Sequence, residues 1–260
     1  MHRDRSIAAW IRRYRPRPNA SVRLVCFPHA GGSAVVFHPW ATAFHPDVEI
    51  LAVQYPGRQD RLAEPRLEDL PELAKQVLPP LRAAVGDSRY ALFGHSMGAT
   101  LAFELARRLE AESDAGPELL VASARRAPSR QRAALVHQLG DADLTTHIAE
   151  LSATNSRLME DPRARAMILP TVRSDLRAIE TYRCPPGLAL RTPILTIIGD
   201  NDRWTTLEEA EAWARHTRGG FELRVLPGGH FYLDEQEAQV RQLVSARLGC
   251  EASPVDPAAR

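Results

Sequence analysis

Short apolar runs alternate with amphipathic helical patterns along most of this chain. Runs that are apolar at nearly every residue are typical of strands buried on both faces, whereas apolar residues spaced three and four apart predict helices. Alternation of the two at this spacing predicts an α/β fold, with a mostly parallel central sheet flanked by helices. The predicted strands are Val22–Phe27, Val48–Gln54, Tyr90–Phe93, Leu119–Ala122, Ile194–Ile198 and Phe221–Leu226, and the predicted helices between them include Leu67–Val85, Thr100–Ala111 and Leu207–His216.

One long segment interrupts this alternation. Between residues 125 and 186 only helical patterns occur, at Ala133–Leu139, Leu144–Leu151 and Ala164–Tyr182. Open α/β sheets hold their ligands at the carboxyl edge of the strands, so this insertion predicts a lid over that edge. A helical layer without a gating role is the alternative. We expect a core of residues 1–124 and 187–250, a lid of residues 125–186 and a disordered tail of residues 251–260.

Composition and charge narrow the classes of function. The chain has 260 residues, and 33 basic against 32 acidic side chains leave a net charge of +1. No overall field therefore attracts nucleic acid or an anionic membrane, and no apolar run approaches the roughly 18 residues that span a bilayer. The arginines near the N-terminus are not followed by the apolar stretch of a signal peptide. We expect a cytoplasmic protein, as a monomer, that binds neither nucleic acid nor membrane.

The cysteines do not indicate a metal or disulfide framework. Cys26, Cys184 and Cys250 are too few and too scattered for either. Cys26 falls inside a predicted strand and is expected to be a small core residue. We expect neither a bound metal nor another cofactor.

The first candidate for chemistry is Ser96 in the stretch Gly94-His95-Ser96-Met97-Gly98, between a predicted strand and a predicted helix. A Gly-x-Ser-x-Gly turn in this context is a nucleophile elbow, in which a strained serine projects its hydroxyl from the turn. Glycine is needed two residues either side because a Cβ there would crowd the neighbouring strand or helix. The alternative is a serine that only caps the helix.

A serine hydroxyl needs a base, and elbow enzymes supply an acid and a histidine later in the chain. His230 follows the strand Phe221–Leu226, so it is expected at the same sheet edge as Ser96. Two acids, Asp200 and Asp202, follow the strand Ile194–Ile198. Asp202 is better placed to turn back toward the histidine, whereas Asp200 is expected to accept hydrogen bonds from loop N–H groups.

An acyl-transfer site also needs donors for the oxyanion. One is expected to be the N–H of Met97, directly after the serine, and the other the N–H of Ala30 in the loop after the first strand. Gly31 and Gly32 let this loop turn its amides inward, although an ordinary Gly-Gly turn is the alternative. The order of residues favours His230 over His29 as the base, and His29 is a candidate for substrate binding.

These motifs together resemble the type II thioesterases that accompany polyketide synthases and non-ribosomal peptide synthetases. The pattern departs at Arg203-Trp204, where many members have Pro after the acid motif, and at Ser152–Asn155, where Gly-Gly-Thr-Pro is expected. The segments that carry the resemblance are CFPHAGGSA (Cys26–Ala34), QYPGRQDR (Gln54–Arg61), GHSMGA (Gly94–Ala99), SARRAP (Ser123–Pro128), LPTVRSDLRAIETYR (Leu169–Arg183), GDND (Gly199–Asp202) and LPGGHFYL (Leu226–Leu233).

The resemblance implies an α/β-hydrolase fold with a helical lid. It also implies hydrolysis of stalled or mis-primed acyl groups from the phosphopantetheine arm of an acyl or peptidyl carrier protein. Arg58 and Arg61 could meet the phosphate of that arm or an acidic carrier surface, or else lie in a solvated turn. Apolar residues of the insertion could line an acyl pocket or pack the lid onto the core: Leu135, Leu139, Leu151, Met159, Leu169 and Leu176.

Three other functions remain open at this point. The same catalytic residues would serve a carboxylesterase or lipase that acts on free esters. They would also serve an acyltransferase or a macrocyclising thioesterase. A catalytically dead hydrolase fold that acts as a binding module is the third, and the complete set of Ser96, Asp202 and His230 argues against it.

Overall fold

The computed structural model describes residues 7–112, 116–132 and 135–250 of the 260-residue chain. The predicted disordered tail, residues 251–260, lies outside the described residues, as do the first two residues of the predicted helix Ala133–Leu139. In the described part, no helix combines the length and the apolar character needed to cross a membrane.

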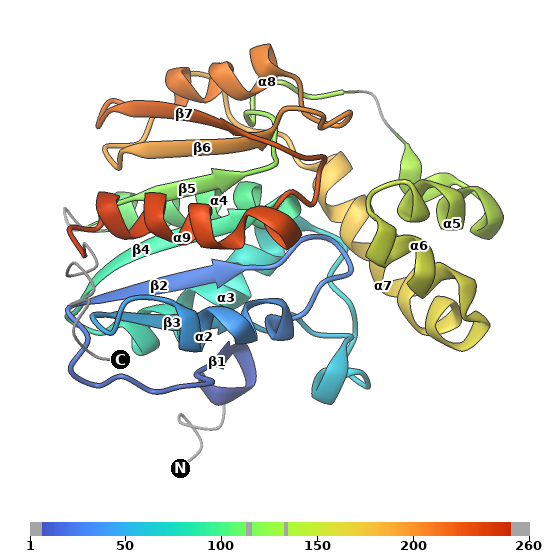
Figure 1. The fold of residues 1–260 in the computed structure, drawn as a ribbon, viewed down its shortest axis with the longest axis horizontal. Helices are drawn as coiled ribbons and strands as arrows, with labels where there is room; N and C mark the ends of the chain where they lie inside the picture. The colour runs from blue at the N-terminus through green and yellow to red at the C-terminus, as the bar shows by residue number, and fades with distance from the viewer. Residues whose placement is uncertain (1–6, 113–115, 133–134, 251–260) are drawn as a thin grey trace, which may run out of the picture.

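A seven-stranded sheet forms the centre of the molecule (Figure 1), in the order β1-β3-β2-β4-β5-β6-β7. All neighbouring strands run parallel except β1, which pairs antiparallel with β3. All six predicted strands are present, and β1 is a further edge strand of two residues, too short to show a pattern. The strands are β1 Ile11–Arg12, β2 Val22–Phe27, β3 Val48–Val53, β4 Arg89–His95, β5 Leu120–Ser123, β6 Ile194–Gly199 and β7 Phe221–Leu226.

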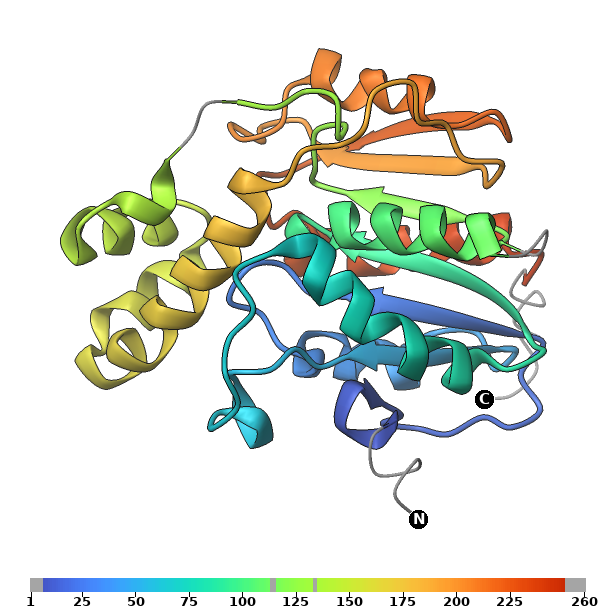
Figure 2. The same ribbon diagram turned by 180° about the vertical axis from the view of Figure 1, so that it is seen from behind.

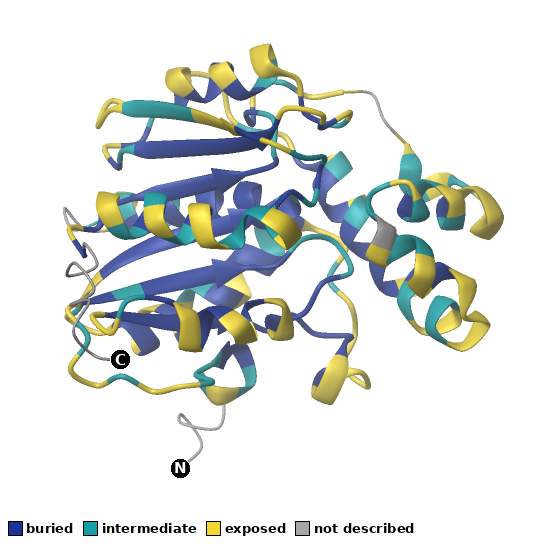
Figure 3. Ribbon diagram, in the orientation of Figure 1, coloured by how far each residue is buried: buried dark blue, intermediate teal, exposed yellow. Residues whose placement is uncertain are grey.

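Helices cover both faces of this sheet. Helices α3 (Leu70–Val85) and α4 (Met97–Glu112) lie on the face seen in Figure 2, and α2 (His38–Ala43) and α9 (Leu233–Arg247) lie on the other. Alternate residues of the central strands pack into separate apolar clusters beneath these layers. Strands β3, β5 and β6 are therefore buried throughout and β2 and β4 nearly so, whereas the edge strand β7 is mostly half-buried or exposed (Figure 3). The remaining helical segments of the core are η1 Ala34–Phe37, η2 Gln59–Arg61, α8 Leu207–Glu211 and η4 Ala212–His216.

The helical insertion, residues 125–186, lies beyond the carboxyl ends of the strands (Figure 1). It contains η3 (Val136–Gln138), α5 (Asp141–Ala149), α6 (Ala153–Glu160) and α7 (Pro162–Thr181). Part of it packs around its own apolar group, which we call the insertion cluster: Leu144, Ile148, Met159, Leu169 and Val172. The last turns of α7 instead join the main core through Ala178, Ile179 and Tyr182.

Some local expectations were wrong. Of the described residues of the predicted helix Ala133–Leu139, only Val136–Gln138 are helical, in η3. The predicted helix Leu207–His216 divides into α8 and η4. Helix α4 starts three residues earlier than predicted, because Gly98, a poor helix former, weakens the helical pattern there.

Two glycines allow α4 to start against the ends of β2 and β4. A Cβ at Gly98 would lie 2.1 Å from the carbonyl oxygen of Phe27, and one at Gly94 would lie 2.2 Å from the carbonyl oxygen of Gly98. Both distances are far below any real Cβ contact, and the atoms that would have to move are backbone atoms. The turn around Ser96 therefore depends on glycine at both positions.

Replacing Gly98 with alanine is expected to lower the free energy of unfolding by about 2 kcal/mol or more, because overpacking against backbone forces the chain apart. Urea denaturation would measure this. Gly140→Ala is a matched control, since no atom lies within 4 Å of its Cβ position. At this helix N-cap it should change stability by less than about 1 kcal/mol. Equal effects of the two substitutions would contradict the prediction.

Candidate active site

Ser96 lies alone between the end of β4 at His95 and the start of α4 at Met97. Its φ of 54° is in the left-handed region, which is uncommon for any residue other than glycine. The Ser96 N–H donates to the carbonyl of Ser123 at 2.8 Å, so the neighbouring strand β5 holds this conformation. Such strain at a single residue is typical of a functional site, and it agrees with the elbow that the sequence predicts.

The structure brings His230 and Asp202 to this serine. His230 Nε2 lies 3.0 Å from Ser96 Oγ, and His230 Nδ1 lies 3.0 Å from Asp202 Oδ2. Asp202 comes from the loop after β6 and His230 from the loop after β7, and both side chains are buried. Three side chains that are far apart in the sequence thus form one chain of hydrogen bonds at the carboxyl edge of the sheet.

The carboxylate fixes the direction of these hydrogen bonds. An ionised carboxylate only accepts, so His230 Nδ1 carries the proton and donates to Asp202. His230 Nε2 is then free to accept the hydroxyl proton of Ser96. Asp202 is itself held by Trp204, whose N–H donates to Oδ1 at 2.8 Å. Asp200, the other acid considered, instead accepts the N–H of Gly228 at 2.9 Å, as the sequence predicts.

The two N–H groups expected to bind an oxyanion belong to Met97, which directly follows Ser96 in the chain, and to Ala30, which lines the cavity at Ser96. Met97 is the first residue of α4, and Ala30 lies in the loop after β2, which lines the cavity together with Ser96 and His230. Neither N–H has a hydrogen-bond acceptor among the residues that the structure describes. Two unused donors beside a serine hydroxyl are the arrangement that an oxyanion requires.

Comparison with known proteins assigns the family. The family model of the thioesterase domain matches residues 22–248 of this chain. The thioesterase PikA5 of Streptomyces venezuelae is 47% identical over 239 residues, which are 92% of this chain and 85% of that protein. This chain belongs to the thioesterase-domain family.

Solved structures support the same assignment. The type II thioesterase BorB, from the borrelidin biosynthetic cluster, is 50% identical with a TM-score of 0.87 and covers 92% of this chain and 98% of its own. RedJ, a thioesterase from the prodiginine biosynthetic pathway in Streptomyces coelicolor, is 34% identical with a TM-score of 0.84. The match covers 89% of this chain and 87% of RedJ. The predicted resemblance to type II thioesterases and the α/β-hydrolase fold are confirmed, and the protein is a thioester hydrolase.

In this thioesterase a cavity of about 230 Å³ opens beside Ser96 and His230. Its walls come largely from the helical insertion. Of the six apolar residues proposed from the sequence, Leu151, Met159 and Leu176 line it, whereas Leu135 is exposed and the other two pack elsewhere in the insertion. Apolar lining residues that the sequence reasoning missed are Val136, Ile148, Leu158, Ile168, Val172 and Ile179.

The two departures from the family pattern both reach this cavity. Trp204 lines it and packs its ring on His147 of α5, with 4.4 Å between the ring centroids. Ser152 caps α6 by accepting the N–H of Asn155, and Asn155 also lines the cavity. The residues that differ from the family thus contribute to the wall of the cavity rather than to the hydrogen-bonded chain at Ser96.

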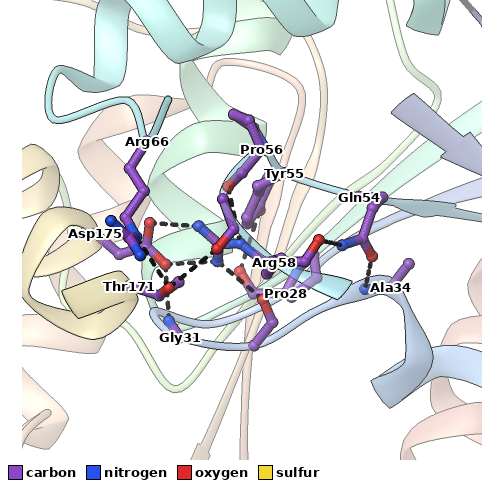
Figure 4. A network of polar contacts seen from close by, with 12 residues as sticks. Pro28, Gly31, Ala34, Gln54, Tyr55, Pro56, Arg58, Arg66, Thr171 and Asp175 are labelled. Carbon is purple, nitrogen blue, oxygen red and sulfur yellow. Dashed lines mark hydrogen bonds and ion pairs between the residues drawn. The ribbon is translucent and has the colours of Figure 1, made fainter. Parts of the chain in front are cut away.

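Arg58 and Arg61 lie in the interior, so the expected solvated turn is wrong. The Arg58 guanidinium forms two hydrogen bonds with Asp175 of α7, at 2.7 and 2.8 Å (Figure 4). Arg61 pairs with Glu64 and lies over the ring of Trp10, 3.9 Å from its centroid. Carboxylates of the chain itself therefore satisfy both cations, which disfavours the proposed contact with a phosphate.

Sequence reasoning did not select Asp175, although a signal was present. In α7 the apolar positions Val172, Leu176 and Ile179 recur at helical spacing, and Asp175 lies among them. A carboxylate on the apolar side of a helix requires a buried partner. That partner is Arg58, 117 positions earlier in the chain.

His29 and His95 lie close to His230, and burial keeps both neutral. Burial, together with the nearby charges of His230 and Arg58, lowers the pKa of His29 to about 3. Burial likewise holds the pKa of His95 well below its usual range. His29 packs edge-to-face on Phe231, with 4.7 Å between the ring centroids. His29 is thus an uncharged wall of the site near neutral pH.

The low pKa of His29 predicts the pH profile of a His29→Gln variant. Because His29 is neutral at every pH above about 4, it cannot contribute the acid limb of kcat/KM between pH 5 and 8. The variant should lower kcat/KM by a similar factor at every pH in this range and leave the midpoint of the acid limb unchanged. Measuring kcat/KM for a thioester from pH 5 to 9 would test this. A midpoint moved by more than ~0.5 unit would show that His29 titrates in this range.

Proposed function

We propose that this thioesterase releases acyl groups from the phosphopantetheine arm of acyl or peptidyl carrier proteins, through an ester on Ser96. The observation that carries the proposal is the hydrogen-bonded chain from Ser96 through His230 to Asp202, which opens into a cavity with apolar walls. The relatives support the carrier-linked substrate, since BorB and RedJ belong to biosynthetic pathways of the kind that carrier proteins serve.

The first half of the reaction forms the ester. His230 Nε2 takes the proton of the Ser96 hydroxyl while Oγ attacks the thioester carbonyl carbon. Asp202 stabilises the imidazolium that results. The tetrahedral intermediate then collapses, the carbon–sulfur bond breaks, and His230 returns its proton to the leaving thiolate, so the arm departs as a thiol.

The second half releases the acid. Water enters where the thiol left and gives a proton to His230 Nε2 as its oxygen attacks the ester carbonyl. Collapse of the second intermediate returns the proton to Ser96 Oγ and frees the carboxylic acid. In both halves we assign the negative oxygen to the N–H groups of Met97 and Ala30. Removal of one such donor typically lowers kcat by about 10²- to 10³-fold.

We assign the helical insertion as a lid that forms the acyl pocket. Its apolar side chains contribute much of the wall of the cavity, and the insertion cluster lets it pack as a unit beyond the sheet. The core supplies Ser96, Asp202 and His230 from loops at the ends of strands. In this assignment the core carries out the chemistry and the insertion selects the acyl chain.

Ser96→Ala tests the acyl-enzyme step. Because serine and histidine act as a unit, the variant should lose up to about 10⁶-fold in kcat, with unchanged circular dichroism. Thioester turnover and mass spectrometry of the enzyme with a slowly released acyl group would measure this. The wild type should carry one acyl mass on the peptide that contains Ser96, and the variant none. Unchanged turnover in a folded variant would contradict the assignment.

A comparison of three substrates with the same acyl group tests the carrier-linked substrate. The substrates are a carrier protein charged with butyryl-phosphopantetheine, the butyryl thioester of N-acetylcysteamine, and ethyl butyrate. Contacts with the carrier and the arm add binding energy away from the reacting carbon. We expect kcat/KM for the charged carrier to exceed that for the free thioester by about tenfold or more. Preference for ethyl butyrate, with no gain from the carrier, would favour a carboxylesterase instead.

A further inference from the structure

Asp175 of α7 is a buried carboxylate whose oxygens are both occupied at the edge of the active site. Its Oδ2 accepts the N–H of Gly31 at 2.7 Å and one guanidinium nitrogen of Arg58 at 2.7 Å. Its Oδ1 accepts the other guanidinium nitrogen at 2.8 Å. Figure 4 shows the two side chains facing each other directly, with Gly31 beside Asp175. Helix α7 thereby contacts the residue directly after Ala30.

Arg58 holds the other side of the same loop. The guanidinium nitrogen that donates to Asp175 Oδ2 also donates to the carbonyl of Gly32 at 2.9 Å. The Gly31 N–H and the Gly32 carbonyl are thus both fixed by one ion pair, which we call the loop clamp. Gly31 has a φ of 79°, and a Cβ there would lie 2.4 Å from the Val172 side chain, so only glycine fits under α7.

Further side chains next to the loop clamp hold the backbone of the loop between β2 and η1 by hydrogen bonds. Tyr55 donates its hydroxyl to the Pro28 carbonyl at 3.1 Å, and Arg58 lies over the ring of Tyr55. Gln54 accepts the N–H of Ala34 at 2.9 Å and donates to the carbonyl of Arg58 (Figure 4). The loop between β2 and η1 is therefore held along its length by side chains from the segment after β3. Asp175 is the contribution from the helical insertion.

A buried ion pair is a weak source of stability, because removing two charges from water offsets much of their attraction. Apolar side chains of similar volume could join α7 to the core with equal or greater stability. They could not fix the N–H of Gly31 and the carbonyl of Gly32 at once. The distinctive property of this pair is therefore the orientation that it imposes on the loop backbone.

We propose that Arg58 and Asp175 are positioning residues for the oxyanion hole. They orient the loop so that the N–H of Ala30 faces the oxygen that develops on the substrate, and they do so only while α7 is docked. This inference rests on the proposed function, in which the Ala30 N–H is an oxyanion donor. A consequence is that the helical insertion takes part in the chemistry as well as in acyl selection.

Asp175→Asn is the first test. An amide cannot accept from both Gly31 and Arg58 with the strength of a carboxylate, so the loop should lose its fixed orientation. A displacement of about 1 Å at such a site costs on the order of 10²-fold in rate. We expect kcat for a free thioester to fall about 10- to 100-fold, within the range for loss of one donor, while KM changes less than about threefold.

A transition-state mimic separates positioning from general damage. A trifluoromethyl ketone analogue of the acyl group forms a hemiketal with Ser96 and places its oxyanion where the substrate does. A matching amide analogue binds without an oxyanion. For Asp175→Asn the dissociation constant of the ketone should rise by the same factor as kcat/KM falls, and that of the amide should not change. Equal weakening of both ligands would overturn the proposal.

Two further variants keep the test decisive if Asp175→Asn is unstable. The double variant Arg58→Met with Asp175→Leu replaces the pair by apolar groups and should keep or raise the melting temperature. Its kcat should remain reduced. If the pair only stabilised the fold, the double variant would have the kcat of the wild type. Thr171→Val is the matched control. It removes the hydroxyl that α7 donates to the carbonyl of Gly57 at 3.1 Å and leaves the loop clamp intact, so kcat should be unchanged.

Failure of this inference can be told apart from failure of the proposed function. If Ser96→Ala is inactive but the double variant has the full kcat of the wild type, the serine mechanism stands and the loop clamp does not position the oxyanion hole. If Ser96→Ala retains full turnover, the proposed function itself is wrong. The midpoint of the kcat/KM pH profile should be the same in all loop-clamp variants, because none contacts His230 or Asp202.

Discussion

The contact between the start of α4 and the ends of β2 and β4 is the constraint on which the active site depends. Backbone meets backbone there without room for a Cβ at Gly94 or Gly98. This crossing forces Ser96 into a left-handed conformation and projects its hydroxyl from the sheet edge. It also brings the first turn of α4 against the loop that carries Ala30. One steric requirement therefore places the nucleophile and both candidate oxyanion donors together.

The parallel sheet supplies the remaining parts of the site by topology. Strands β4, β6 and β7 end at the same edge, so Asp202 and His230 reach Ser96 although 106 and 134 positions separate them from it. The order of the strands, rather than any local sequence, makes these loops neighbours. Burial then adjusts the chemistry, because it holds His29 neutral beside the site while His230 keeps a carboxylate partner.

The sequence predicts best what depends on local pattern. The central strands are apolar at nearly every residue, and Ser96, Asp202 and His230 each follow a predicted strand. The elbow turn and the order of these residues along the chain therefore indicate them. Helix α9 was missed because most of its positions are polar and only Val240 and Val244 are buried. The ion pair between Arg58 and Asp175 cannot be predicted from the sequence around either residue, because each side chain alone indicates only a charge. Partners 117 positions apart are defined by the fold.

The division between core and insertion explains where this chain can vary. Its departures from the family pattern, at Trp204 and around Asn155, change the cavity wall and leave the hydrogen-bonded chain at Ser96 intact. In the proposed function the cavity wall selects the acyl group, so that selection is separate from the chemistry at Ser96. The loop that carries Ala30 is the exception, because core and insertion both hold it through Arg58 and Asp175. A substitution that displaces α7 would therefore alter rate as well as specificity, unlike one confined to the cavity wall.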